Sequence, residues 1–275
     1  MRTSKRKHLA WPYVVWIVLF TLMPLFYIVY YAIRDKKGNF TLSNLLAIFE
    51  PVHLKAFGIS VELAVITTLI CLVLAYPVVL ILRSLKFRKK GTVVAVLILP
   101  MWMNFILRVY AWQVLLSDNG VINSLLEAVG LQKLSIINTP AAIVLGMVYD
   151  FLPFMILPIY NTLMEIPEEI LEASRDLGAR GVTRFVKIIW PLTMPGVLSG
   201  ITMVFVPAMT SFVFSDILGG SKIQLIGNII EQEFTTSMNW QLGSGLSVAL
   251  MIIVLAFMAL VQRLNKQNKG SNMLW

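Results

Sequence analysis

Six apolar runs of at least 20 residues, separated by short polar segments, constrain this chain more than any other feature. A helix needs about 20 predominantly apolar residues to cross the hydrocarbon core of a bilayer. The runs predict an all-α, polytopic membrane protein with six transmembrane helices. One membrane domain is expected over residues 1–275, with spans at 11–33, 57–82, 92–116, 141–163, 191–218 and 242–261.

The composition agrees with a membrane location, since 58% of the residues are hydrophobic, 13% are charged and the mean hydropathy is +0.79. Soluble domains carry about 25% charged residues. The net charge of +9 comes from Lys and Arg in short clusters between apolar runs. That arrangement differs from the continuous basic face of nucleic-acid-binding proteins, so we expect no nucleic acid partner.

The distribution of Lys and Arg predicts the orientation. Sixteen of these residues fall before the first run, at 83–91, between the fourth and fifth runs and in the C-terminal tail, whereas six fall in the alternate segments. Cytoplasmic loops are the ones enriched in Lys and Arg, so both termini are expected in the cytoplasm of a bacterial cell. The polar segment 34–56 contains four of those six Lys and Arg residues and therefore weakens this asymmetry. The first run is too long for a signal peptide and lacks a small-x-small cleavage site.

The sequence lacks the metal-binding and nucleotide-binding motifs that are typical of soluble enzymes. Cys71 is the only cysteine, and His8 and His53 have no cysteine near them, so we expect no metal site and no catalytic residues. No GxxxxGK[ST] sequence occurs, and the chain is therefore not expected to bind ATP by that route.

The segment 165–190 between the fourth and fifth runs is unusually long and mixed in charge. Pro167 followed by two acids suits the first turn of a helix, and Gly178 suits its end. A second helix is predicted over 182–189, ending at Pro191. The residues alone allow two interpretations: a docking element for a partner, or an amphipathic connector on lipid headgroups.

A resemblance separates these interpretations. Glu172-Ala173-Ser174, three residues, Gly178, nine residues and Ile188-Ile189-Trp190-Pro191 together resemble the EAA loop of ABC importer permeases. Ser174 and Trp190 depart from the usual alanine and leucine. The resemblance implies the type I (MetI-like) permease fold, with 165–190 as a cytoplasmic coupling loop that inserts into a groove of an ATPase subunit. It implies that Glu172 pairs with a cation there, and that ATP and Mg are bound by the ATPase rather than by this chain. The coupling residues it implies are Glu172, Ala173, Ser174, Asp176, Leu177 and Gly178.

The segments 99–108, 152–155, 192–196 and 216–220 resemble the polyamine (spermidine/putrescine) permeases of this class. The run 225–230 favours their B-type over their C-type subunit. The resemblance implies four kinds of partner: a second, C-type permease subunit, an ATPase dimer, an extracytoplasmic polyamine-binding protein and the surrounding membrane lipid.

Charges at membrane depth usually face a cavity or a partner, and Glu62, Arg108, Asp150 and Asp216 lie in the apolar runs. A polycation needs carboxylates and aromatic faces along its path. Arg108 and one carboxylate form, on the alternative interpretation, a structural ion pair. Prolines and glycines in the fourth and fifth runs are expected to break those helices beside the path. The candidate path residues are Asp216, Asp150, Trp102, Tyr110, Tyr149 and Phe214.

Other functions remain open from the residues alone. A secondary transporter also uses broken helices and intramembrane carboxylates, but typically has internal repeats. The same ABC machinery also serves thiamine, phosphonate or ferric iron, although one intramembrane cation disfavours an anionic cargo. A cation channel is disfavoured because no selectivity-filter sequence occurs.

Overall fold

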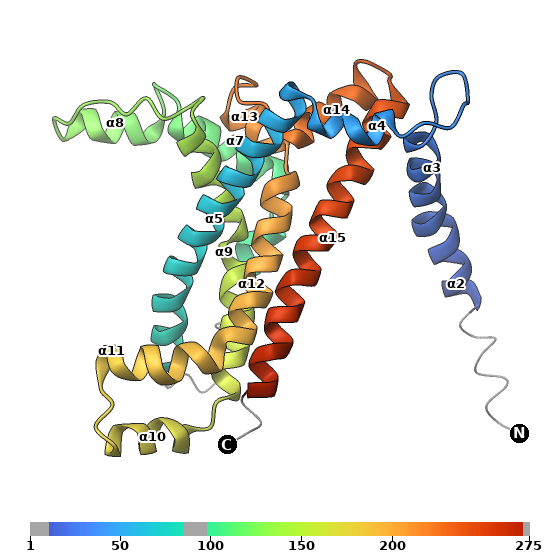
Figure 1. Ribbon diagram of the computed structural model, residues 1–275. Helices are drawn as coiled ribbons and strands as arrows, with labels where there is room; N and C mark the ends of the chain where they lie inside the picture. Colours follow the sequence, from blue (N-terminus) through green and yellow to red (C-terminus); the bar gives the residue numbers. More distant parts are fainter. Residues whose placement is uncertain (1–10, 85–97, 272–275) are drawn as a thin grey trace, which may run out of the picture. The chain divides into compact units, whose positions relative to one another are not determined.

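The computed structural model describes residues 11–84 and 98–271, which fold into helices joined by short turns (Figure 1). Five helical segments are long and apolar enough to cross a membrane: Trp11–Ala32, Pro51–Ser84, Pro140–Glu165, Gly181–Thr210 and Trp240–Arg263. In chain order the elements are α2 (Trp11–Ile17), η1 (Val18–Leu22), α3 (Met23–Ala32), α4 (Ser43–Leu46), η2 (Ala47–Phe49), α5 (Pro51–Ser84), η3 (Leu99–Trp102), α7 (Phe105–Leu116), α8 (Val121–Ala128), α9 (Pro140–Glu165), α10 (Glu168–Asp176), α11 (Gly181–Arg184), η4 (Phe185–Ile189), α12 (Trp190–Thr210), α13 (Val213–Leu218), α14 (Ile226–Thr235) and α15 (Trp240–Ser271).

The predicted third span, 92–116, differs from the structure. Its first residues, up to 97, lie outside the described part of the chain. The remainder forms the short 3-10 segment η3 and then α7, which begins at Phe105. Asn104 separates them because its side-chain oxygen accepts hydrogen bonds from the backbone N–H groups of Ile106 and Leu107, at 2.9 and 3.3 Å. This is an N-cap, so α7 starts as a new helix.

The chain divides into two compact units, of which the first comprises Met1–Lys55 and Ile229–Leu255. In this unit the start of α15 approaches the segment before α5 closely. A Cβ on Gly245 would lie 2.4 Å from the Asn44 carbonyl oxygen, so only glycine fits at this contact. The Asn44 side chain in turn donates to the carbonyls of Ala32 and Arg34 and thereby fixes the end of α3.

The loop after α3 is a tight hairpin closed by an isolated bridge between Arg34 and Phe40. Asp35 accepts hydrogen bonds from the backbone N–H groups of Asn39 and Lys37, both at 2.8 Å. The Asn39 backbone hydrogen bond lowers the pKa of the Asp35 carboxyl. Gly38 adopts a φ of +85° at the turn, which a side chain would disfavour.

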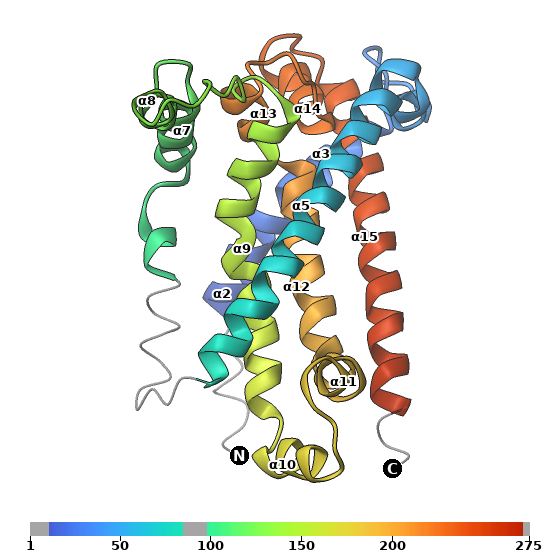
Figure 2. The same ribbon diagram turned by 90° about the vertical axis from the view of Figure 1, so that its left-hand side faces the viewer.

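The second unit comprises Ala56–Asn228 and Ala256–Trp275, and α12 packs along α9 in it (Figure 2). Gly196 and Gly200 lie at the contact with the small-xxx-small spacing that lets membrane helices approach. A Cβ on Gly196 would lie 2.6 Å from the Pro158 carbonyl oxygen, and one on Gly200 would lie 2.7 Å from the Met155 sulfur.

The expectation that prolines and glycines break the fourth and fifth helices is wrong. Both α9 and α12 continue through their internal prolines. Hydroxyl groups accompany two of these positions, since Thr162 donates to the Pro158 carbonyl and Ser199 to the Pro195 carbonyl, both at 2.9 Å. The glycines serve close packing between the helices rather than interruption.

The helix of the coupling segment does not end at Pro191, contrary to expectation. Residues 181–210 are helical throughout, with a π-helical segment, η4, just before the proline, and the chain changes direction sharply between α11 and α12 (Figure 1). Proline lacks an N–H and its ring clashes with the carbonyl four residues earlier. A π-helical turn shifts that carbonyl to an i→i+5 arrangement and accommodates the ring. The same pairing occurs in the first span, where η1 precedes Pro24.

The predicted fifth span, 191–218, is two helices rather than one. α12 ends at Thr210, Ser211 is extended with a ψ of 112°, and α13 follows. Phe214 of α13 is fully buried and contacts Phe105 and Phe151 edge-on, with ring centroids 5.4 and 5.7 Å away. This aromatic cluster explains the turn, because it directs α13 back onto α7 and α9.

Candidate coupling loop and substrate path

The helix α10 presents two different faces. Leu171 and Ser174 are buried, with 5% exposure each, and the Ser174 hydroxyl donates to the Leu171 carbonyl at 2.7 Å. Glu172 and Ala173 are exposed, as is the side chain of Leu177 at 88%. The outward residues of the implied coupling set are therefore available to a partner. Ser174 instead packs inward, where alanine and serine are both small enough.

Gly178 ends α10 through a Schellman motif. The Ala179 N–H donates to the Ser174 carbonyl and the Gly178 N–H donates to the Arg175 carbonyl, both at 2.9 Å. Gly178 has a φ of +82°, in the left-handed region that favours glycine. A Cβ at this position would meet nothing within 4 Å, so the requirement is conformational and not steric.

Arg83, which the sequence did not single out, fixes the coupling helix to the spans. From the end of α5 it donates to the carbonyls of Leu163 and Ile166 at the end of α9, the latter at 3.0 Å. It also pairs with Glu168 in the first turn of α10, at 3.3 Å. The Arg83 side chain is only 15% exposed. One guanidinium thus holds three elements together, and we name this contact the Arg83 clamp.

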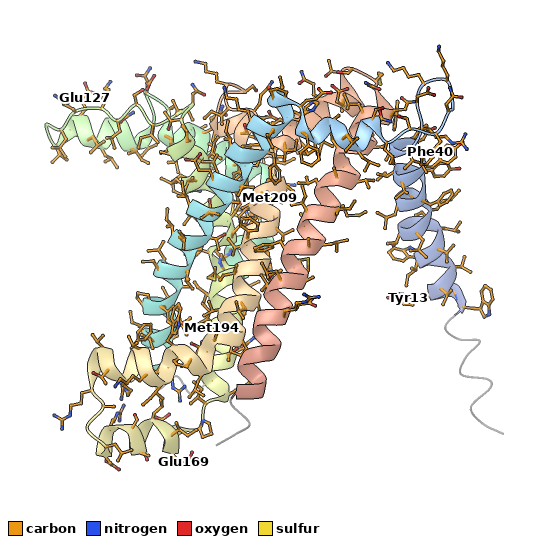
Figure 3. All side chains as sticks on the ribbon, viewed as in Figure 1. Tyr13, Phe40, Glu127, Glu169, Met194 and Met209 are labelled. Carbon is orange, nitrogen blue, oxygen red and sulfur yellow. The ribbon has the colours of Figure 1, made fainter. Side chains whose placement is uncertain are left out.

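Figure 3 shows where the loop lies within the second unit. Glu169 of α10 lies beyond Met194 at the start of α12, whereas Met209 marks the other end of that helix. The coupling loop and the Arg83 clamp therefore share one end of the unit, and α13 lies at the opposite end (Figure 2).

Trp190, the departure from the usual leucine of the EAA loop, has a defined place. Its ring stacks on Tyr76 of α5 at 5.2 Å, and Phe185 meets Tyr76 edge-on at 5.1 Å. The Tyr76 hydroxyl lies 2.7 Å from that of Thr193. Aromatic pairs of this geometry contribute about 0.5–1.5 kcal/mol beyond their burial. The larger residue strengthens the junction between the loop and the spans.

Asp150 and Arg108 form an ion pair inside the helix bundle. Arg108 Nε lies 3.1 Å from Asp150 Oδ1, and the two side chains are 10% and 3% exposed. Neither carboxylate oxygen makes an aligned hydrogen bond with a residue in the described ranges. Arg108 also donates to the Pro100 carbonyl at 3.1 Å. The structure therefore supports the ion-pair alternative for Asp150, because each buried charge compensates the other.

Asp216 occupies a different environment, in the first turn of α13. It is exposed, and its Oδ1 accepts a hydrogen bond from Asn228 Nδ2 at 2.7 Å. Asn228 also donates to the Phe212 carbonyl and accepts from the Leu225 N–H. This bonding holds the segment 225–228 against α13. Asp216 is consequently presented on an ordered surface at the end of the unit opposite the coupling loop.

The aromatic candidates do not form one cluster. Trp102 is 81% exposed and Tyr110 is 49% exposed, on η3 and α7. Tyr149 is 41% exposed and meets Trp112 edge-on at 5.3 Å. Phe214, by contrast, is buried in the cluster described above. Within the described ranges, no group of three or more His, Cys, Asp or Glu side chains is placed to hold a metal ion.

The described residues form a helical membrane domain in which the exposed, glycine-terminated helix α10 follows the α9 span. This is the arrangement that the resemblance to permease subunits of type I ABC importers implies. The comparison with protein families agrees. Residues 63–268 match the family of binding-protein-dependent transport system inner membrane components, and the chain belongs to this family.

Two curated relatives are closely similar over most of the chain. The spermidine/putrescine transport system permease protein PotB of Haemophilus influenzae is 35% identical over 259 residues, which cover 91% of each chain. PotB of Escherichia coli is 38% identical over 247 residues, covering 87% of this chain and 90% of the relative. Among solved structures, a chain of a bacterial ABC transporter that imports alginate has a TM-score of 0.79 at 14% identity, with 96% of each chain covered. That likeness concerns the fold.

Family membership settles the general role. The chain is a multi-pass protein of the cytoplasmic membrane and a transport subunit rather than an enzyme. An importer of this class contains a second permease subunit, an ATPase that hydrolyses ATP and a substrate-binding protein outside the membrane.

Proposed function

We propose that this chain imports polyamines, with spermidine and putrescine as the cargo, and that it forms the translocation path together with a C-type permease subunit. The similarity to PotB proteins over about nine tenths of the chain carries this proposal. The cargo arrives on an extracytoplasmic polyamine-binding protein, and a dimeric ATPase binds the ATP and Mg.

Asp216 makes the first contact with the cargo in this proposal. It is the exposed carboxylate of the two candidates, whereas Asp150 is 4% exposed and paired with Arg108. The hydrogen bond from Asn228 orients the Asp216 carboxylate. An ammonium group released at this end therefore meets a preorganised anion. Asp150 would become available only if its pairing with Arg108 opened.

Exposed aromatic rings continue the path. Trp102, Tyr110 and Tyr149 each leave more than two fifths of their surface uncovered in this chain. Ammonium groups are attracted to such ring faces by about 0.5–2 kcal/mol, depending on desolvation. We assign these rings to the surface that the second permease subunit completes, and assign Phe214, which is fully buried, to packing.

Coupling to ATP hydrolysis occurs through α10 in this proposal. Glu172, Ala173 and Leu177 enter the groove of the ATPase, while Asp176 lies beside them on the exposed side. Gly178 and the Arg83 clamp keep the helix in a fixed orientation against the spans. The loop, and with it both termini, lies in the cytoplasm according to the Lys and Arg distribution.

Uptake of radiolabelled spermidine tests the cargo, in cells that lack their own importer and receive the complete complex. We expect uptake by the parental complex and a loss of about tenfold to hundredfold for Asp216→Asn, since a charge-assisted contact contributes about 1.5–3 kcal/mol. Asp118→Asn is the matched control, because Asp118 is an exposed acid in the loop after α7 and only screened, long-range attraction is lost.

Two results would contradict the proposal at different levels. Equal uptake by the Asp216→Asn and Asp118→Asn complexes would remove Asp216 from the path. If the parental complex takes up neither spermidine nor putrescine, the importer carries another cargo. Thiamine or ferric iron would then be tested before phosphonate, because Arg108, the intramembrane cation of the sequence analysis, is already paired with Asp150.

A further inference from the structure

A cavity of about 550 Å³ lies behind the coupling helix, between α10, the end of α5 and the segment formed by α11 and η4. Its walls are of two kinds. Leu80, Leu171, Phe185 and Ile189 supply an apolar side. Three arginines, 83, 175 and 184, and the single acid Glu168 supply the polar side.

The charges of this cavity are not balanced by the residues that the structure describes. Arg83 is engaged by two carbonyls and by Glu168 in the Arg83 clamp. Arg175 and Arg184 form no ion pair with any residue of the described ranges. Arg184 Nε is moreover buried and has no hydrogen-bond partner there. A buried donor left without a partner indicates a missing ligand, ion or water, and two unbalanced guanidinium groups select an anion.

The cavity is on the inner side of α10. Glu168, Leu171 and Arg175 follow the i, i+3, i+7 spacing of one helix face. Glu172 and Ala173, which are assigned to the ATPase groove, lie on the exposed part of the helix and do not line the cavity. An occupant of the cavity therefore supports α10 from behind and leaves its docking surface open.

The position suits an amphiphile better than a free ion. Leu80 and Arg83 belong to the last turns of α5, one of the helices long enough to cross the membrane, so the cavity is at the level of the headgroups. Basic pockets between transmembrane helices on the cytoplasmic side bind anionic lipid headgroups. The apolar wall offers a surface for the start of an acyl chain beside the arginines.

We propose that this cavity binds the phosphate of an anionic phospholipid, with Arg184 and Arg175 as its ligands. The bound headgroup completes the polar bonding of Arg184 and links α10 to α11 from the membrane side. Lipid composition then regulates how firmly the coupling helix is held. The site does not depend on which cargo the importer carries.

The test uses the complete complex in nanodiscs of phosphatidylcholine with or without phosphatidylglycerol. Native mass spectrometry counts phosphatidylglycerol molecules that remain on this chain after release from the nanodisc. We expect one retained molecule for the parental complex. Arg184→Gln and Arg175→Gln should each weaken retention by about fivefold, the contribution of one cation near an anionic surface. Lys187→Gln is the matched control, since Lys187 is an exposed cation of η4 that does not line the cavity.

A second readout separates this site from the others discussed above. ATP hydrolysis stimulated by the loaded binding protein should rise with phosphatidylglycerol in the parental and Lys187→Gln complexes, and should not respond in Arg184→Gln. Equal lipid retention by the Arg184→Gln and Lys187→Gln complexes would overturn the proposal. If excess inorganic phosphate abolishes the dependence of ATP hydrolysis on phosphatidylglycerol, the cavity binds a free anion instead. Unchanged lipid retention with weaker ATPase association in Arg184→Gln would assign it to the ATPase.

Discussion

Replacing Arg83 with glutamine tests the contact on which the rigidity of the coupling loop depends. The change removes the charge and the guanidinium group that donates through two nitrogens, while it keeps a planar polar side chain. The carbonyls of Leu163 and Ile166 lose their donor at the end of α9, and Glu168 loses its cation. The three losses differ in size, and the structure allows them to be ranked.

The carbonyl bonds dominate the expected effect. A hydrogen bond from a charged donor contributes about 1.5–3 kcal/mol, and Arg83 is 15% exposed and therefore little screened by water. The pair with Glu168 is worth only ~0–1 kcal/mol, because the Glu168 side chain is 62% exposed. We estimate a total of about 2–4 kcal/mol for Arg83→Gln, after allowing for water reaching the freed carbonyls. Glu168→Gln should cost less than about 1 kcal/mol.

These values give distinct outcomes in proteoliposomes. Arg83→Gln should insert normally and keep basal ATP hydrolysis. The uptake and hydrolysis that the loaded binding protein stimulates should fall by about thirtyfold to several hundredfold. Glu168→Gln should stay within about fivefold of the parental complex. An equal loss in both variants would mean that the ion pair, rather than the carbonyl contacts, orients α10. Full stimulation of the Arg83→Gln complex would refute the clamp altogether.

Three further predictions follow from particular residues. Gly178→Leu should uncouple transport, because the left-handed conformation costs a branched residue about 1–2 kcal/mol, whereas Gly178→Asn should retain most uptake; similar uptake by both would argue against a conformational role. Gly196→Ala should lower the free energy of unfolding of the detergent-solubilised complex by about 1–3 kcal/mol, because the added methyl group clashes with a backbone carbonyl of α9. A complex as stable as the parental one would contradict that close contact. In a Cys71→Ala background, Val182→Cys should react with an impermeant maleimide only from the cytoplasm and Asn119→Cys only from outside, and the reverse would invert the orientation.

Local patterns in the sequence predicted local structure well. The start of α10 at Glu168 and its glycine end at Gly178 follow from proline, acids and glycine within one short segment. A similar glycine signal lies after α8, which ends at Ala128 shortly before Gly130 with its φ of +79°. Such signals act between near neighbours, where the backbone preferences of individual residues decide the outcome.

Contacts between distant segments could not be predicted in this way. Arg83 meets α9 and α10 some 80 residues later, and its basic cluster was only a topology signal in the sequence. An ion pair between Arg108 and one carboxylate was an alternative from the sequence, but only the packing of α7 against α9 identifies Asp150 as the partner. The continuity of the helices through their prolines could not be predicted from residue preferences, because each proline is accommodated locally. The Thr162 and Ser199 hydroxyls donate to the carbonyls of Pro158 and Pro195, and a π-helical turn precedes Pro191.

The helix α12 connects the coupling segment to the far end of the unit, because the chain changes direction sharply between α11 and α12 and α12 runs along α9 (Figure 1). Its 21 residues extend about 32 Å at 1.5 Å per residue. Tilting this helix by about 5° at the end next to η4 moves the opposite end by roughly 3 Å. That opposite end is where the chain turns at Ser211 into α13, which carries Asp216. In the proposed function, a small rotation of the ATPase is therefore enough to displace the carboxylate that we assign to cargo entry.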